Sequence, residues 1–152
     1  MLVLLRRLAA LRRDIALEPS RDPGSLALRH VDAGSCNGCE HELGATANPY
    51  YDLGRHGLDI VASPRHADVL LVTGPVTTRM REPLLRAYAA MPEPRLVAAL
   101  GDCAMGCGVL AMASELAPPL EELLPVDIRI PGCPPTPATI AEHLLRRLGS
   151  DV

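Results

Sequence analysis

Residues 68–75, D-V-L-L-V-T-G-P, decide the fold class of this chain: four consecutive apolar residues are followed by Thr and a Gly-Pro pair. A strand that is apolar throughout is buried on both faces, which is typical of a parallel sheet covered by helices on each side. Residues 95–100, R-L-V-A-A-L, repeat the pattern, and two shorter strands are predicted at residues 59–62 and 126–130. The sequence therefore predicts a sheet of parallel strands.

Helices are predicted between these strands. Residues 78–90 and 137–148 have helical patterns, and a short Ala- and Met-rich helix is expected after Cys103. Strands that alternate with helices indicate an α/β fold, here a flavodoxin-like parallel sheet with helices on both faces. In such sheets, binding sites form in the crevice beyond the carboxyl ends of the strands. We therefore expect the functional site at that edge.

Length and composition indicate one globular domain and exclude a nucleic-acid-binding role. The chain has 152 residues, of which 48% are hydrophobic, so it can bury one sizeable core. Its formal net charge is −3, and it contains no Phe, no Trp and only three Tyr residues. Neither a basic surface nor aromatic stacking on bases is available. No nucleic acid partner is expected.

The N-terminal segment differs from the rest of the chain. Residues 2–18 place leucines at helical spacing with four arginines between them, and residues 18–24 have the composition of a linker. We predict an amphipathic basic helix and linker over residues 1–24 and an α/β domain over residues 25–152. The helix would lie on a membrane surface, on a partner or on its own domain. Because two arginine pairs interrupt the apolar pattern, no export signal is expected, and no segment reaches the length of a membrane span.

Four cysteines stand in segments rich in Gly or Pro: Cys36, Cys39, Cys103 and Cys133. Cys103 and Cys133 each follow a predicted strand closely, so both should lie at the carboxyl edge of the sheet. The C-N-G-C turn would have to fold over that edge to join them. No apolar strand is predicted immediately before Cys36.

Several chemistries fit these thiols. Four thiolates from separate segments suit an iron–sulfur cluster, and they could also hold a structural zinc ion. A third interpretation is a dithiol oxidoreductase that uses Cys36 and Cys39, although this motif normally follows a strand and opens a helix. The fifth thiol, Cys107, lies four residues after Cys103. It is either an alternative ligand or a small buried residue on a Gly-rich turn.

Several longer motifs carry a family resemblance. They are G-S-C-N-G-C-E-H-E at 34–42, N-P-Y-Y-D-L-G-R-H-G at 48–57, A-S-P-R-H-A-D-V-L-L-V-T-G-P-V-T at 62–77, M-P-E-P-R at 91–95, G-D-C-A at 101–104 and P-G-C-P-P at 131–135. Over residues 27–148 the chain resembles the family of the complex I 20 kDa subunit and the NiFe-hydrogenase small subunits. It is most similar to small subunits of group 4, energy-converting hydrogenases of the formate hydrogenlyase type. Complex I members have adjacent cysteines where this chain has C-N-G-C.

The resemblance implies a function and a ligand set. Cys36, Cys39, Cys103 and Cys133 match the ligands of one proximal 4Fe-4S cluster, so the chain is expected to be an electron-transfer subunit of a membrane-associated oxidoreductase complex. Residues 25–152 would form an iron–sulfur α/β domain with no complete active site of its own. The implied partners are a hydrogenase large subunit or complex I 49 kDa-like subunit, a ferredoxin-like iron–sulfur subunit and membrane subunits. The implied location is cytoplasmic, on the inner face of the cell membrane.

Other positions of the motifs carry weaker expectations. Glu42 matches an acidic position near the cluster and is a candidate proton relay, or else a solvent-exposed charge at a helix start. Glu40 and His41 are expected at the surface or at an interface. Residues 63–68 would form a partner-facing loop in which Arg65 and His66 donate hydrogen bonds to cluster sulfurs or to the large subunit. The alternative is that Asp68 and Arg65 only cap the turn before the next strand. Cys107 replaces a glycine that is usual in the family.

Overall fold

The computed structural model describes residues 24–148, in which five parallel strands form one sheet in the order β2-β1-β3-β4-β5. In chain order the elements are β1 (Leu26–Asp32), α2 (Gly38–Ala45), η1 (Leu53–His56), β2 (Leu58–Ile60), η2 (Pro64–His66), β3 (Val69–Thr73), α3 (Thr78–Ala89), β4 (Leu96–Leu100), α4 (Leu120–Leu123), β5 (Ile128–Ile130), α5 (Pro137–Leu145) and η3 (Arg146–Leu148). This order is that of flavodoxin-like sheets. The predicted fold class is confirmed.

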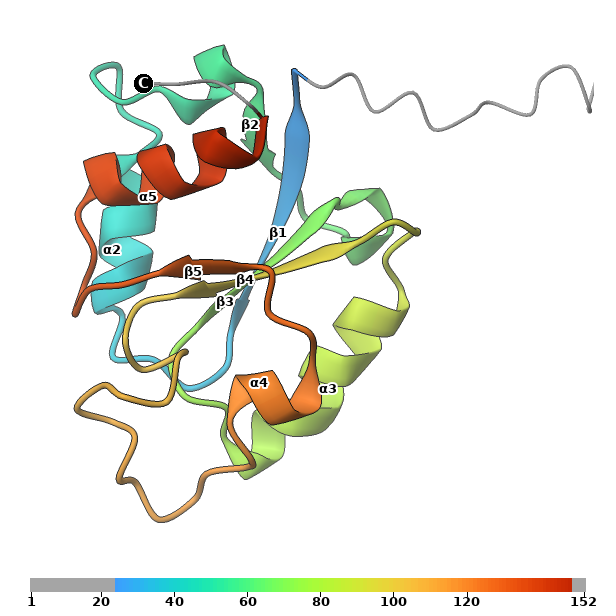
Figure 1. The fold of residues 1–152 in the computed structure, drawn as a ribbon, viewed down its shortest axis with the longest axis vertical. Helices are drawn as coiled ribbons and strands as arrows, with labels where there is room; N and C mark the ends of the chain where they lie inside the picture. The colour runs from blue at the N-terminus through green and yellow to red at the C-terminus, as the bar shows by residue number, and fades with distance from the viewer. Residues whose placement is uncertain (1–23, 149–152) are drawn as a thin grey trace, which may run out of the picture.

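Helices cover both faces of the sheet, with α2 and α5 on one face and α3 and α4 on the other (Figure 1). The central strand β3 is buried at all five positions. Val69 and Leu71 pack into the core beneath α2 and α5, while Leu70 and Val72 pack into the core beneath α3 and α4. This double burial is the physical reason for the uninterrupted apolar segment that predicted the strand.

All strand pairs are parallel, so the carboxyl ends of β1, β3, β4 and β5 meet at one edge of the sheet. Asp32 at the end of β1 is in register with Thr73 at the end of β3, and Thr73 is in register with Leu100 at the end of β4. The loops that leave these strands therefore start side by side. This register brings segments that are far apart in sequence to one place.

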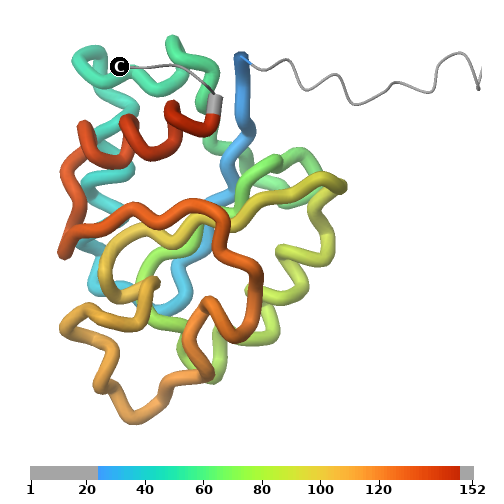
Figure 2. Tube along the Cα trace, viewed as in Figure 1, coloured from blue at the N-terminus to red at the C-terminus, as the bar shows by residue number. Residues whose placement is uncertain are grey.

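Two sequence expectations about elements are wrong. The strand β1, L-A-L-R-H-V-D, was not predicted, because Arg29 and His30 interrupt its apolar residues. The short Ala- and Met-rich helix after Cys103 does not form, and residues 102–113 are mostly turns. Gly106 has φ +77°, which interrupts a right-handed helix. In Figure 2 the gold and orange trace of this loop extends beyond the sheet before α4.

The other predicted elements form close to the predicted bounds. α3 begins after Thr77, whose side chain accepts a hydrogen bond from the backbone of Met80, and α5 begins after Thr136 in the same way. The last predicted helix ends as an α-helix at Leu145 and continues as the 3-10 turn η3. The predicted basic helix at residues 2–18 lies outside the described residues, as do residues 149–152. None of the helices in the described part is long and apolar enough to cross a membrane.

Candidate metal centre

The four cysteines of the sequence prediction come together at the carboxyl edge of the sheet. Cys36 follows β1, Cys39 lies in the first turn of α2, Cys103 follows β4 and Cys133 follows β5. All four line one cavity of about 60 Å³. Cys39 and Cys103 are buried, whereas Cys36 and Cys133 are exposed. The cavity is therefore walled by buried thiols on the side of the sheet and by exposed thiols on the side of the solvent.

Two glycines make room for the buried sulfurs. Gly101 has φ +88°, and a Cβ atom at this position would lie 2.5 Å from Sγ of Cys39. At Gly108 a Cβ atom would lie 2.3 Å from Sγ of Cys103. Since real Cβ atoms do not come so close to a sulfur, any larger residue at these two positions would displace a thiol. The glycines of the G-D-C-A region are thus required by the position of the cysteines.

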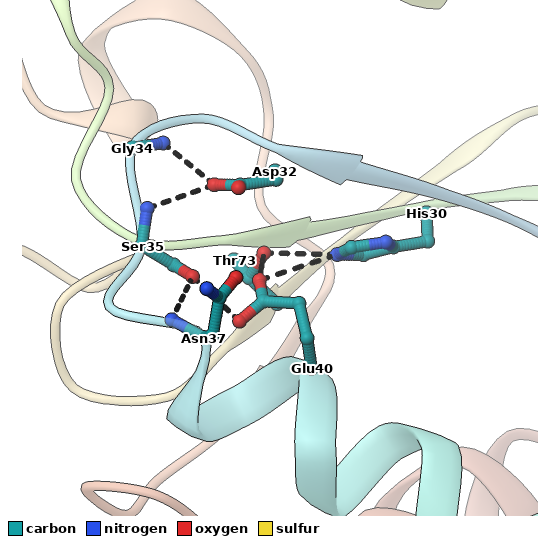
Figure 3. Close-up of polar contacts among 7 residues, drawn as sticks. All are labelled: His30, Asp32, Gly34, Ser35, Asn37, Glu40 and Thr73. Atoms are coloured by element: carbon teal, nitrogen blue, oxygen red, sulfur yellow. Dashed lines mark hydrogen bonds and ion pairs between the residues drawn. The ribbon is translucent and has the colours of Figure 1, made fainter.

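Side-chain hydrogen bonds hold the turn that carries Cys36 and Cys39 (Figure 3). Asp32 Oδ1 accepts hydrogen bonds from the backbone N–H groups of Gly34 at 2.9 Å and Ser35 at 2.8 Å. Ser35 Oγ in turn donates to Glu40 Oε2 at 2.5 Å. The carboxylate of Glu40 also accepts a short hydrogen bond from the hydroxyl of Thr73 at the end of β3. The turn is therefore connected to two strand ends.

Backbone hydrogen bonds hold the two loops that carry Cys103 and Cys133. The backbone N–H of Gly101 donates to the Ile130 carbonyl at 2.8 Å, and that of Asp102 donates to the Gly132 carbonyl at 2.9 Å, so the β4 and β5 ladder continues past the strands. Asp102 Oδ1 accepts a further hydrogen bond from the Gly132 backbone N–H at 2.7 Å. These three bonds fix the separation of the two loops.

The environment of the buried thiols favours their protonated form in the absence of a ligand. Burial, followed by the negative charge of Glu40 and of the other three thiols of the cavity, raises the pKa of Cys39 to about 12. Burial also raises the pKa of Cys103, against a hydrogen bond from the Leu110 backbone, and the charges of Cys133 and Cys36 raise it further. The four sulfurs are therefore close enough to influence each other. A positively charged metal group would relieve this repulsion.

Cys107 lies outside the cavity of the four cysteines. It is exposed rather than buried, and its Sγ lies 3.4 Å from the backbone carbonyl of Asp102, to which it donates. The cavity lining does not include it. The interpretation of Cys107 as a small buried residue is thus wrong, and the position gives no geometric support to its role as an alternative ligand.

The two acidic residues of α2 differ in burial and in contacts. Glu40, expected at the surface, is half-buried and joins Ser35 and Thr73. Glu42, the candidate proton relay, is partly exposed, and its carboxylate has no hydrogen bond or ion pair within the described part of the chain. His41 is exposed, as expected. Sequence reasoning missed the contacts of Glu40, Asp102 and His30. The available signals were that Glu40 directly follows Cys39 and that Asp102 directly precedes Cys103.

Arg65 and His66 do not lie at the end of the sheet that carries the four cysteines. They lie in η2, which precedes β3 and therefore stands at the amino end of that strand, whereas the cysteines stand at the carboxyl ends. Ser63 caps this turn by accepting from the Arg65 backbone N–H at 3.4 Å. Asp68 Oδ2 accepts from the backbone N–H of Ala27 at 2.9 Å. The expectation of hydrogen bonds to cluster sulfurs is wrong, and the turn is capped by Ser63 rather than by Asp68 or Arg65.

The four thiols at the cavity form a possible donor set for a metal group. Within residues 24–148, no three Cys, His, Asp or Glu side chains gather closely enough to hold a single metal ion. A structural zinc ion needs four ligands in a tight shell, with sulfurs about 2.3 Å from the metal. Four thiols that surround a common space instead match the donor set of an iron–sulfur cluster. The residues present therefore fit that group.

A dithiol function fits less well, although a strand does precede the motif, contrary to the sequence prediction. Strand β1 does precede Cys36, and α2 does open at the motif, as a thiol–disulfide exchange site requires. Burial raises the pKa of Cys39 to about 12, so the attacking thiol of such a site would have to be the exposed Cys36. A dithiol site would also leave Cys103 and Cys133 at the cavity without a role.

Comparisons with known proteins agree with this site. The family model described as "NADH ubiquinone oxidoreductase, 20 Kd subunit" matches residues 36–146, a range that includes all four cysteines. The probable membrane-bound hydrogenase subunit mbhJ of Pyrococcus furiosus is 47% identical over 119 residues, which are 78% of this chain and 71% of that relative. Formate hydrogenlyase subunit 7 of Escherichia coli is 44% identical over 78% of this chain, which spans only 47% of that relative.

A solved structure supports the same relationship. A chain of the membrane-bound sulfane sulfur reductase, an archaeal respiratory membrane complex, superposes with a TM-score of 0.72 at 30% identity, over 84% of this chain and 70% of that chain. The resemblance inferred from the cysteine motifs is thereby confirmed. This chain belongs to the family of the NADH ubiquinone oxidoreductase 20 Kd subunit.

Proposed function

We propose that this chain is an electron-transfer subunit that holds one proximal 4Fe-4S cluster through Cys36, Cys39, Cys103 and Cys133. The observation that carries the proposal is the convergence of these four thiols, from three separate loops, on one cavity. When bound, such a cluster takes up and releases one electron at a time. The relatives named as hydrogenase and formate hydrogenlyase subunits support an oxidoreductase complex as its setting.

The protein's own contribution is to hold and partly bury the group. Cys39 and Cys103 would bind it on the side of the sheet, where the surroundings are apolar, and Cys36 and Cys133 would bind it on the open side. The raised pKa values of Cys39 and Cys103, caused first by burial, mean that binding must release protons from these thiols. Gly101 and Gly108 keep the space around both sulfurs free of side chains.

The edge that carries the cysteines has the features of a surface that a partner covers. Val109 is 79% exposed and Met112 is 95% exposed, on the loop that follows Cys103. A cavity of about 260 Å³, lined mostly by apolar residues of this loop and of the segment after β3, lies next to Cys103. Exposed apolar groups of this kind mark interaction sites. They support contact with a large subunit close to the cluster.

The proposed setting is a membrane-attached complex of the group 4 NiFe-hydrogenase or complex I type, on the cytoplasmic face of the membrane. The large subunit would carry the catalytic centre, and a ferredoxin-like subunit and membrane subunits would complete the complex. This chain would supply no complete active site. Glu42, three residues after Cys39, is retained in the proposal as a candidate proton relay, although it lies partly exposed on α2.

The first experiment tests the cluster. The full chain is purified anaerobically with its copurifying subunits, and iron, zinc, acid-labile sulfide and the EPR spectrum after dithionite reduction are measured. Because a ferredoxin-like subunit would add iron and sulfide of its own, the proximal cluster is measured as a difference. We expect Cys133→Ala to lower the iron and the sulfide content by four each per chain and to abolish the proximal signal. The matched change Cys107→Ala should leave the signal intact, since Cys107 lies outside the cavity.

Three other results would contradict the proposed cluster or its ligands. A colourless chain that contains one zinc ion and no sulfide would replace the proposal with a zinc-stabilised binding module. A Cys36–Cys39 disulfide that forms and breaks reversibly, without iron, would replace it with a dithiol oxidoreductase. Loss of the signal in Cys107→Ala but not in Cys133→Ala would overturn the ligand assignment. Mass spectrometry of the copurifying subunits tests the proposed partners in the same preparation.

A further inference from the structure

A half-buried carboxylate lies at the base of the turn that carries Cys36 and Cys39. Glu40 directly follows Cys39 in α2, and its side chain is 20% exposed. Oε2 accepts a hydrogen bond from Ser35 Oγ at 2.5 Å, and Oε1 accepts one from the hydroxyl of Thr73. Oε1 also lies 3.6 Å from Nε2 of His30. Figure 3 shows all three partners pointing toward this one carboxylate.

The partners of Glu40 are themselves anchored. Thr73 is fully buried at the end of β3, and its Oγ1 lies 2.9 Å from Nε2 of His30, on β1. Ser35 Oγ also accepts a hydrogen bond from the backbone N–H of Asn37 at 3.0 Å. The carboxylate therefore connects β1, β3, the turn and α2. A charge held by this many contacts stays at one place beside the thiols rather than moving freely into solvent.

We propose that Glu40 is a positioning residue that holds the Cys36–Cys39 turn against the end of β3 and whose fixed negative charge lowers the reduction potential of the group bound by the thiols. The proposal rests on the proposed function. Reduction adds one electron to the bound group without forming or breaking a bond in the protein. A negative charge nearby opposes this addition, and the effect is larger where the charge is only partly exposed to water.

The first test separates the charge from the hydrogen bonds. Glu40→Gln removes the negative charge and keeps an oxygen that accepts from Ser35 or Thr73. An EPR-monitored redox titration of the anaerobic full chain with its subunits, with dithionite as the reductant, should show a midpoint potential higher than that of the unchanged protein. Iron and sulfide content should stay the same. An unchanged potential in a fully loaded Glu40→Gln protein would overturn the effect of the charge.

The matched control is Glu122→Gln, which removes the same charge from an exposed position on α4, outside the proposed electron- and proton-transfer site. Because the Glu122 side chain has no hydrogen bond or ion pair within the described residues, its charge is not held beside the thiols. Its shift in potential should therefore be clearly smaller. An equal shift in both variants would show a general effect of acidic residues and would overturn the specific role of Glu40.

The positioning role has its own variant. Glu40→Asp keeps the charge, but its shorter side chain cannot reach both Ser35 and Thr73. We expect a broadened or altered EPR signal and a lower iron content, with a potential closer to that of the unchanged protein than in Glu40→Gln. An unaltered signal and full iron content would overturn the positioning role. If Glu40→Gln failed to retain iron, Glu40→Asp would still report the effect of position.

Failure of the proposed function gives a different pattern. An unchanged protein without iron, sulfide or EPR signal would reject the cluster and, with it, the role of Glu40. A normal cluster in the unchanged protein, combined with unshifted variants, would reject only the role of Glu40. Spectra of the unchanged protein therefore separate the two proposals before any variant is compared.

Discussion

The turn that carries Cys36 and Cys39 is anchored by side chains, whereas the loops that carry Cys103 and Cys133 are anchored by backbone. In the first half of the cavity, Glu40 receives hydrogen bonds from Ser35 and Thr73. In the second half, the β4 and β5 ladder continues through Gly101 and Asp102. Gly101 and Asp102 directly follow β4, so their backbone can continue the hydrogen bonds of the sheet. The turn at Cys36 and Cys39 begins several residues after β1 ends, so its backbone cannot. Substitutions that change side-chain chemistry should therefore disturb the Cys36–Cys39 turn most. Substitutions that add side-chain bulk should disturb the Cys103 and Cys133 loops most.

The largest effect is expected from Gly101→Ala. The new Cβ atom would stand 2.5 Å from Sγ of Cys39 and 3.3 Å from the Gly132 carbonyl oxygen, at a backbone φ of +88°. The positive φ alone costs about 1–2 kcal/mol for a residue other than glycine, and the displaced thiol should remove most of the bound iron. Urea unfolding and iron analysis measure both effects.

Gly44→Ala is the matched control for this change. Gly44 lies inside α2, and no atom other than those of its chain neighbours and its own helix backbone is within 4 Å of the position of its Cβ. We expect full iron content and a gain of up to about 1 kcal/mol in the free energy of unfolding, because alanine favours the helix. A Gly101→Ala protein as stable and as rich in iron as the Gly44→Ala protein would contradict the close approach of Cys39.

An intermediate effect is expected from Asp102→Ala, which removes a side-chain hydrogen bond that joins the two loops of the backbone-held half. The Gly132 backbone N–H would lose its acceptor at 2.7 Å, at a cost of about 1–3 kcal/mol in the free energy of unfolding. Asp102→Asn keeps the acceptor oxygen and should lose less than half as much. Equal losses in the two variants would mean that the charge of Asp102, and not its hydrogen bond, matters.

The smallest expected effect is a pH dependence of the free energy of unfolding that arises from His30, which lies beside Glu40 and Thr73. Burial lowers the pKa of His30 below its ordinary value of 6.5, against the opposing charges of Glu40 and Asp32. Below pH 6.5 the unfolded chain therefore binds this proton before the folded chain does, so His30 makes stability fall as the pH falls through this window. His30→Gln should reduce that loss in urea unfolding between about pH 7.5 and about pH 5. An identical pH profile in the variant would contradict the direction of the shift.

Most of the fold was predictable because buried strands have apolar sequences that can be recognised segment by segment. β3 and β4 are buried on both faces, and their uninterrupted apolar segments reveal it. β1 was not predictable in this way, because Arg29 and His30 occupy the middle of the strand. The helix expected after Cys103 failed for another local reason, since the positive φ of Gly106 favours turns. A continuous apolar segment thus predicts a buried strand well, but a strand that contains charged or polar residues is easily missed.

Much less of the site was predictable. Cysteines in Gly- and Pro-rich segments indicated a thiolate centre, and the motifs indicated the family. Nothing local separates Glu40 from Glu42, which stand two residues apart in one helix. Only the register that sets the end of β1 beside the end of β3 brings Thr73 and His30 to Glu40. For the same reason, Arg65 and His66 looked relevant in sequence but stand at the opposite edge of the sheet.

The sequence by itself determined the class of the fold, the four candidate ligands and the family to which the chain belongs. These properties depend on residue types and short patterns that each segment carries alone. The tertiary structure decided that the four thiols share one cavity, that Cys107 lies outside it and that Glu40 is the carboxylate fixed beside it. Such facts depend on strand order and register, which bring together side chains from segments that are distant along the chain.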